Sequence, residues 1–345
     1  MTDPANPLGL NGFEFVEFTS PDPLAMAKQF EQLGFVPTHR HLTKNITRYK
    51  QGRINLMLNR DADGRVAQFR NEHGASASAM AFRVADPAAA MKWALENGAQ
   101  RTDEDDTVIT GIGGSYLYFI ADGVDLYADW AEIPGWQEAE AANNVGLDLL
   151  DHLTHNVRRG QMQVWSAFYK TLFGFEEQKY FDIKGQATGL FSQAMIAPDK
   201  AIRIPLNESQ DDKSQIEEFI REYHGEGIQH LALTTPDIFD TVERLRARGV
   251  KLQDTIETYY ELVDKRVPGH GEDLERLRKN RILIDGNVGD EGLLLQIFTE
   301  NMFGPIFFEI IQRKGNEGFG NGNFQALFES IELDQIRRGV IQVDA

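Results

Sequence analysis

The chain repeats one pattern of helices and turns, and this repeat restricts its fold more than any other feature. One helical stretch ends at Leu33-Gly34-Phe35 and a second ends at Gly174-Phe175. Later in each half, a helical stretch runs from an Asp to a Gly twelve residues further on, Asp86 to Gly98 and Asp237 to Gly249. Self-similarity of this kind indicates two copies of one supersecondary unit. We therefore predict an α+β fold with two similar halves of βαβ-plus-hairpin type.

Hydrophobic periodicity and turn residues predict the elements of the first half. The expected elements are a strand over 12–20, a helix from Asp22-Pro23 to Gly34, strands within 45–60 and 78–84, a helix over 86–98, and a hairpin of 116–120 with 124–130. Asp122-Gly123 is the expected turn of that hairpin. The polar residues 138–144 are expected to form a linker.

The pattern restarts at Gly146. The expected elements are strands over 149–153, 228–234, 293–299 and 305–312, helices that end at Gly174 and Gly249, and a C-terminal helix. The predicted domains are therefore residues 1–136 and residues 146–345.

Composition excludes several classes of function. The 345 residues carry a formal net charge of −18, which argues against binding to nucleic acid or to an anionic membrane surface. There is no cysteine, so any metal site must consist of His, Asp and Glu. The N-terminal residues resemble no signal region, and no stretch is long enough to span a bilayer. We expect a soluble cytoplasmic protein.

Glu309 lies inside an apolar, β-branched run, Pro305 to Gly315, that is typical of a buried strand. Burying a carboxylate is costly unless a cation pairs with it. That cation is either a nearby Arg or Lys, which is the commoner case, or a metal ion.

Two histidines fall in predicted strands of the second half, His152 and His230. His155 competes with His152, but residues three apart on a strand point to opposite faces, so only one of them can serve a given metal. A single strand histidine is more often a hydrogen-bonded core residue than a ligand. Two imidazoles and one buried Glu together match the facial triad that leaves open positions on Fe(II).

The repeat supplies an internal comparison for this site. Aligning the halves places Glu17 at the position of His152, Ala79 at that of His230 and Ala128 near that of Glu309. The first half therefore lacks the ligand set, and we expect one metal per chain, held in the second half.

Around these residues the sequence resembles the 4-hydroxyphenylpyruvate dioxygenases of the vicinal oxygen chelate superfamily. The matching strings occur in family order and cover nearly all of residues 148–335. They are Asp151-His-Leu-Thr-His-Asn156, Ile204-Pro-Leu-Asn-Glu208, Gly225-Glu-Gly-Ile-Gln-His230, Leu294-Leu-Gln-Ile-Phe-Thr299, Phe307-Phe-Glu-Ile-Ile-Gln-Arg313 and Gly318-Phe-Gly-Asn-Gly-Asn-Phe324.

The resemblance implies two tandem vicinal oxygen chelate domains built from βαβββ repeats, the first metal-free and the second an open barrel with a C-terminal gate helix. It implies one Fe(II) per chain, held by His152, His230 and Glu309. The implied reaction converts 4-hydroxyphenylpyruvate and O₂ to homogentisate and CO₂, a step of tyrosine catabolism. A homo-oligomer, either a dimer or a tetramer, is expected.

The resemblance also implies a substrate pocket. Its residues would be Ser192, Asn207, Gln215, Gln229, Gln296, Phe298, Phe319, Phe324 and Phe328, with Gln296 and Phe298 also catalytic. Gln296 and Phe298 are two apart on a predicted strand and so share one face. Phe324 and Phe328 keep helical spacing after a possible N-cap, Asn323, although such a stripe is also typical of core packing. Ser192, Asn207 and Gln215 could equally be surface residues.

Two alternatives remain open. A 4-hydroxymandelate synthase would use the same substrate and ligands, and the resemblance separates it by a smaller aliphatic residue in place of Phe298. A non-catalytic protein of paired domains that sequesters a small molecule or a metal belongs to a different class of function. Consumption of O₂ with 4-hydroxyphenylpyruvate would distinguish it from either enzyme.

Overall fold

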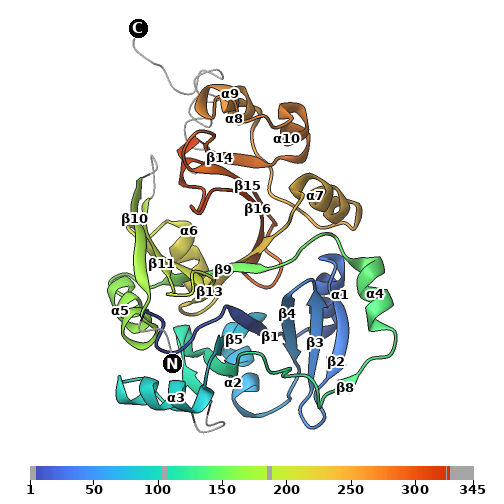
Figure 1. Cartoon of the computed structure of the whole chain (residues 1–345), viewed down its shortest axis with the longest axis vertical. Helices are drawn as coiled ribbons and strands as arrows, with labels where there is room; N and C mark the ends of the chain where they lie inside the picture. The colour runs from blue at the N-terminus through green and yellow to red at the C-terminus, as the bar shows by residue number, and fades with distance from the viewer. Residues whose placement is uncertain (1–4, 103–106, 185–188, 324, 327–345) are drawn as a thin grey trace.

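The computed structural model describes residues 5–102, 107–184, 189–323 and 325–326, which form two eight-stranded sheets, one in each half of the chain (Figure 1). The first half contains β1 Phe13–Thr19, α1 Pro23–Gln32, β2 Val36–Arg40, β3 Ile46–Gln51, β4 Ile54–Asn59, α2 Gly64–His73, β5 Ser76–Val84, α3 Pro87–Glu96, β6 Val108–Thr110, the 3-10 turn η1 Ile112–Gly114, β7 Tyr116–Ala121, β8 Ala131–Glu132 and α4 Trp136–Asn143.

The second half repeats the arrangement with additional helices. It contains β9 Leu150–Val157, α5 Met162–Phe173, β10 Glu176–Lys184, β11 Gly189–Ile196, β12 Arg203–Ser209, α6 Gln215–Glu222, β13 Gly227–Thr234, α7 Ile238–Ala247, α8 Glu257–Glu261, α9 Val263–Arg266, α10 Leu274–Asn280, β14 Leu283–Asn287, β15 Gly292–Phe298 and β16 Phe307–Lys314.

Seven strands of each sheet share one topology, and the eighth strand (β8 or β14) lies at opposite edges of the two sheets; the shared part confirms the predicted repeat. In the first sheet, β1 pairs antiparallel with β5 and β5 pairs parallel with β7. In the second, β9 pairs antiparallel with β13 and β13 pairs parallel with β16. The second sheet ends at β10 on one side and β14 on the other. Figure 1 shows it curving around a common interior as an open half-barrel.

Helix starts follow the expected chemistry. Asp22 and Asp86 each precede a proline at the first helical position, and their carboxylates accept hydrogen bonds from backbone N–H groups of the first turn. Asp237 caps α7 in the same way. Such caps stabilise a helix by about 1 kcal/mol each, because they satisfy N–H groups that have no partner within the helix.

Two expectations for the first half are wrong, and one helix was not expected. Residues 124–130 form no strand, and Val124 is 62% exposed. The segment is instead held by buried Tyr127, whose hydroxyl donates to Glu14 at 2.9 Å. The expected linker is mostly helix α4, which has no buried residue and is held by contacts such as the ion pair of Lys50 with Glu140 at 2.7 Å. Helix α2 was not predicted, because its polar sequence has little amphipathic pattern.

The two halves share one continuous core. Phe303 of the second half packs edge-on against Phe18 and Phe30 of the first, with ring centroids 5.4 and 5.3 Å apart. Contacts of this kind explain why the halves form one body in Figure 1.

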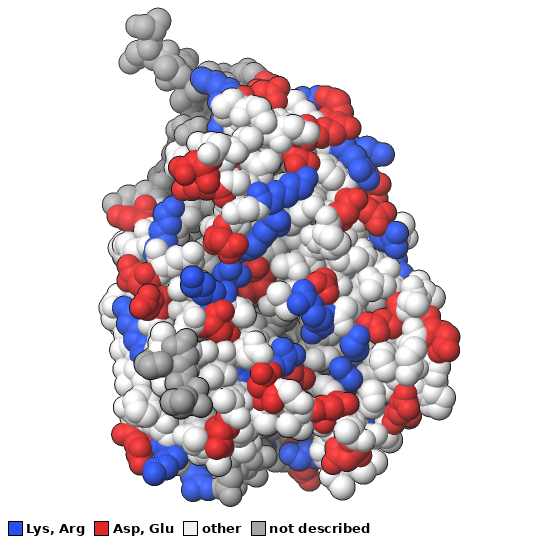
Figure 2. All heavy atoms as spheres, in the orientation of Figure 1, with Lys and Arg blue, Asp and Glu red and all other residues white. Residues whose placement is uncertain are grey.

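On the face in Figure 2, the described acidic and basic side chains are interspersed. None of the described helices is both long enough and apolar enough to cross a membrane. Of the expected C-terminal gate helix, residues 321–323 and 325–326 are described and helical, whereas residues 324 and 327–345 lie outside the described residues.

Candidate metal centre

Three neighbouring strands carry the candidate ligands. His152 on β9 lies opposite Ala232 on β13, and Ala232 lies opposite Glu309 on β16. Directly paired residues share a sheet face, and His230 shares it too because it is two residues from Ala232. The small side chain of Ala232 leaves room for His152 and Glu309 to approach each other above it.

The ligand atoms converge on one point. Nε2 of His152 lies 3.2 Å from Oε2 of Glu309, and Nε2 of His230 lies 3.4 Å from the same oxygen. One atom from each residue fits within 4.8 Å of the other two, and all three residues are buried. Metal–ligand bonds of about 2.1 Å at right angles would separate two donors by about 3.0 Å, so the observed distances fit one bound metal ion.

The residue before each histidine fixes its tautomer. Oδ1 of Asp151 lies 2.9 Å from Nδ1 of His152, and Oε1 of Gln229 lies 3.0 Å from Nδ1 of His230. Both oxygens accept a hydrogen bond from Nδ1–H, which leaves the Nε2 lone pair for a metal. The Thr154 hydroxyl also lies 3.0 Å from Nε2 of His230, a contact that a metal would replace.

Two β-bulges make these contacts possible. Between β9 and β13 the register skips Asp151 on one strand and Gln229 on the other. In a regular strand each residue would point away from the histidine beside it. A bulge changes the direction of the side chain of its extra residue. The side chains of Asp151 and Gln229 therefore reach the neighbouring imidazole.

Burial and hydrogen bonding shift the pKa values of the three candidate ligands in opposite directions. Burial raises the pKa of Glu309, but hydrogen bonds to His152 and His230 outweigh it and lower that pKa to about 2. Burial lowers the pKa of His230 below its ordinary value. Burial also disfavours the charged form of His152, but hydrogen bonds with Asp151 and Glu309 raise its pKa overall. Glu309 is therefore an anion that a cation would stabilise.

Asp151 is itself held by two arginines. Arg313 donates to both of its carboxylate oxygens, from Nε at 2.8 Å and from Nη2 at 2.7 Å. Arg203 donates from Nη1 at 3.3 Å. Burial would raise the pKa of Asp151, but its hydrogen bonds and charge interactions with Arg313 and His152 hold that pKa well below its usual range. The sequence did not single out Asp151 or Arg313 as site residues.

Gln296 and three phenylalanines surround the ligands. Nε2 of Gln296 donates to Oε1 of Glu309 at 2.7 Å. The Phe319 ring lies edge-on to His152 at 5.3 Å, and the Phe298 ring lies edge-on to His230 at 6.4 Å. Phe307, which the sequence did not single out, stacks on His230 at 4.8 Å. One side of the site is therefore aromatic.

His155 faces away from this centre, as strand alternation predicts. Its Nε2 lies 2.7 Å from the hydroxyl of Tyr169 on α5. Burial lowers the pKa of His155 to about 3, so it is neutral at physiological pH. His155 is a core residue.

The other expected pocket residues lie at different places. Ser192, Asn207 and the buried Asn156 form one row across β11, β12 and β9. Both polar atoms of the Asn156 amide lack a hydrogen-bond partner among the described residues, so this row offers an amide that a ligand could satisfy. Gln215 is exposed at the beginning of α6. Phe324 and Phe328 lie outside the described residues.

The shared topology identifies the first-half counterparts of the ligands. Ala81 on β5 pairs with Phe15 on β1 and Tyr118 on β7, as Ala232 pairs with His152 and Glu309.

The positions of His152 and Glu309 are therefore occupied by Phe15 and Tyr118, and the expectation of Glu17 and Ala128 is wrong. The alignment failed because bulges shift the register between strands. The Phe15 and Tyr118 rings pack 5.5 Å apart and fill the space. Among the described residues, the group found suitable for a metal is that of the second half.

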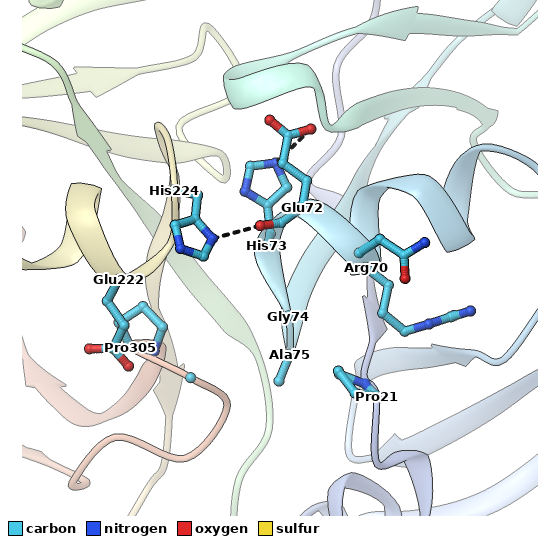
Figure 3. A pocket seen from close by; sticks show the side chains of 11 residues that line it. Pro21, Arg70, Glu72, His73, Gly74, Ala75, Glu222, His224 and Pro305 are labelled. Carbon is cyan, nitrogen blue, oxygen red and sulfur yellow. Dashed lines mark hydrogen bonds and ion pairs between the residues drawn. The ribbon is translucent and has the colours of Figure 1, made fainter.

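A cavity of about 420 Å³ lies elsewhere, between the two halves (Figure 3). Two histidines on its wall, one from each half, each donate a hydrogen bond to the backbone of the other half. Nδ1 of His73 donates to the carbonyl oxygen of Tyr223, and Nδ1 of His224 donates to that of Glu72, both at 2.7 Å. The dashed line from His224 in Figure 3 marks the second bond. Among the described residues, the side chains on this wall form no group of three converging metal ligands, so we treat the cavity as a feature of the interface between the halves.

Comparison with known proteins assigns both halves. A family described as hydroxyphenylpyruvate dioxygenase, N-terminal, matches residues 5–132. The glyoxalase, bleomycin resistance protein and dioxygenase superfamily matches residues 149–262.

Individual relatives match over nearly the whole chain. The 4-hydroxyphenylpyruvate dioxygenase of Pseudomonas aeruginosa is 55% identical over 97% of this chain and 97% of its own. Hemolysin VllY of Vibrio vulnificus is 52% identical over 99% of each. A solved structure of a triple mutant of 4-hydroxymandelate synthase from Streptomyces coelicolor is similar, with a TM-score of 0.81, 26% identity, and 95% and 99% of the two chains covered.

Proposed function

The chain belongs to the 4-hydroxyphenylpyruvate dioxygenase family, and we propose that it converts 4-hydroxyphenylpyruvate and O₂ to homogentisate and CO₂ at an Fe(II) held by His152, His230 and Glu309. The observation that carries the proposal is the convergence of two Nε2 atoms on one oxygen of Glu309, at 3.2 and 3.4 Å, within a buried site. Two imidazoles and one carboxylate leave open positions on Fe(II).

The charge of the site suits the substrate. One carboxylate and two neutral imidazoles around a divalent cation give a net charge of about +1. This local charge attracts a monoanionic 2-oxo acid, even though the protein as a whole carries −18. When bound, the iron supplies the activation of O₂ and the oxidising power.

The protein's own residues hold the ligands and the substrate. Asp151 and Gln229 keep both imidazoles in the tautomer that presents Nε2. Gln296 holds one oxygen of Glu309, so that the other faces the histidines. We assign Phe298, Phe307 and Phe319 to the wall that orients the aromatic ring and excludes water.

The row of Ser192, Asn207 and Asn156 would bind the polar end of the substrate. Asn156 lies four residues from His152 along β9, which corresponds to about 13 Å. An elongated substrate that is anchored at the metal by its oxo acid would therefore point its phenol toward this row. The unpartnered amide of Asn156 supports this assignment. The roles of Gln215, Phe324 and Phe328, and the homo-oligomeric state, remain predictions.

O₂ uptake tests the proposal. The Fe(II)-loaded chain is expected to consume O₂ only when 4-hydroxyphenylpyruvate is present, and the His230→Ala variant is expected to consume none. A folded, iron-loaded chain that consumed no O₂ with this substrate would refute the proposal and favour a sequestering role.

A further inference from the structure

A chain of hydrogen bonds leads from helices α8 and α9 to the candidate ligand Glu309. Nη2 of Arg266 donates to the Tyr259 hydroxyl at 2.7 Å, and that hydroxyl donates to Oδ1 of Asn323 at 2.6 Å. Nδ2 of Asn323 donates to Oε1 of Gln296, and Nε2 of Gln296 donates to Oε1 of Glu309, both at 2.7 Å. Four consecutive short bonds thus join five side chains from four parts of the sequence.

Arg266 and Glu309, at the two ends of this series of hydrogen bonds, fix which group donates and which accepts at each step. A guanidinium can only donate and a carboxylate can only accept. The Tyr259 oxygen accepts from Arg266 and from the backbone N–H of Ile284, at 2.7 and 2.9 Å. Two acceptors are within reach of its own proton, Oδ1 of Asn323 at 2.6 Å and the carbonyl oxygen of Ile284 at 3.1 Å, and the shorter contact is the one to Asn323. The amides of Asn323 and Gln296 must follow the same direction.

This direction matters at Glu309. Gln296 occupies Oε1, while Oε2 is the oxygen that lies near both histidines. If the Gln296 amide rotated, it would present its own oxygen to Oε1, and the carboxylate would turn to avoid it. The donation from Asn323 opposes that rotation.

The backbone on the N-terminal side of Asn323 packs closely against the side chains of Gln296 and Asp285. Gly320 has a positive φ of 74°, and a Cβ there would lie 1.7 Å from Oε1 of Gln296. A Cβ at Gly322 would lie 2.0 Å from Oδ1 of Asp285, whose Oδ2 accepts from the Gly322 N–H at 2.8 Å. Only glycine fits at either position without displacing a neighbour.

We propose that Tyr259 is a positioning residue that, through Asn323 and Gln296, fixes which oxygen of Glu309 is presented to the metal. This inference rests on the proposed metal centre. Tyr259 is buried and its ring touches no ligand among the described residues, so it acts through the relay rather than on substrate. Removing its hydroxyl frees both amides to rotate, and the carboxylate then binds the metal in a less constrained way.

The test compares Tyr259→Phe with Tyr260→Phe in the full chain. Both remove one buried phenol oxygen from α8, but only the first belongs to the relay. Each Fe(II)-loaded protein is mixed with a chelator, and the rate of iron loss is measured. The Co(II)-loaded forms give a visible spectrum that reports the coordination of the metal. Residues that orient metal ligands typically change metal affinity about 10–100-fold when they are lost.

We expect Tyr259→Phe to lose iron about 10-fold faster than the parent and to shift the Co(II) bands, while Tyr260→Phe matches the parent. A parent-like rate and spectrum for Tyr259→Phe would overturn the relay, as would equal acceleration in both variants.

If Tyr259→Phe fails to fold, Asn323→Asp keeps the side-chain shape but faces Gln296 with an acceptor. It should then accelerate iron loss at least as strongly, and unchanged iron loss would overturn the relay. A parent chain that takes up neither metal would overturn the metal centre itself, and the relay with it.

Discussion

Replacing Asp151 by Asn removes one buried charge and keeps the shape of the side chain. Asp151 is 3% exposed, and its partners Arg313 and Arg203 are 13% and 12% exposed. After Asp151→Asn both guanidinium groups lose their shared carboxylate in a site that water hardly reaches. Arg203 keeps its ion pair with the exposed Glu317, whereas Arg313 keeps hydrogen bonds to backbone oxygens of Asn316 and Gly318. Removing one partner from a buried ion pair costs about 3–5 kcal/mol, because the remaining charge is left uncompensated. The His152 imidazole also loses its charged acceptor, which predicts a metal affinity lower by about 10–100-fold.

Urea unfolding of the metal-free protein measures the first effect, and competition with a chelator measures the second. The matched control is Asp148→Asn. Asp148 pairs with Arg53 at 2.5 Å, but the two side chains are 44% and 66% exposed. Exposed pairs contribute about 0–1 kcal/mol, so the control should lose little stability and no metal affinity. Equal losses of unfolding free energy in the two variants would refute the reasoning about burial.

Three further predictions concern single residues. His230→Ala should abolish metal binding, whereas His155→Ala should keep the metal, as measured by metal analysis of the purified proteins; loss of metal from the His155 variant alone would reverse the assignment. Because burial lowers the pKa of His155 from 6.5 to about 3, its contribution to stability is complete above pH 6.5 and is lost progressively toward pH 3. Between pH 7 and pH 5 the parent should therefore lose about 2 kcal/mol more unfolding free energy than His155→Gln, and equal losses in urea titrations would contradict this. Phe298→Ile should divert part of the product to 4-hydroxymandelate, and chromatography that found only homogentisate would remove the specificity role of Phe298.

The sequence predicted the three candidate ligands because strand alternation and burial are local signals. A carboxylate in an apolar strand and two strand histidines needed no knowledge of the partner strands. The same alternation showed that only one of His152 and His155 could serve the metal, and the resemblance, not the alternation, selected His152; in the structure His155 contacts Tyr169 of α5 instead. The repeat of the two halves was also readable, since capping Asp and terminal Gly residues recur at equal spacing.

The residues that position the candidate ligands could not be predicted from local sequence signals. Asp151 and Gln229 reach the histidines only because β-bulges reverse the alternation, and a bulge depends on the pairing of two strands. Arg313 reaches Asp151 across 162 positions of sequence. The prediction of a hairpin from 116–120 and 124–130 was wrong for a related reason. A turn sequence does not determine whether the segment that follows it pairs with a strand.

Product analysis after reaction with isotopically labelled O₂ tests the central claim most directly. The Fe(II)-loaded chain, given 4-hydroxyphenylpyruvate, is expected to form homogentisate that carries both atoms of O₂, with CO₂ released from the substrate's carboxyl group. Homogentisate should be absent with His230→Ala. Formation of mainly 4-hydroxymandelate by the parent chain would contradict the assigned reaction, and recovery of unchanged substrate from an iron-loaded chain would contradict the assignment of His152, His230 and Glu309 as a catalytic centre.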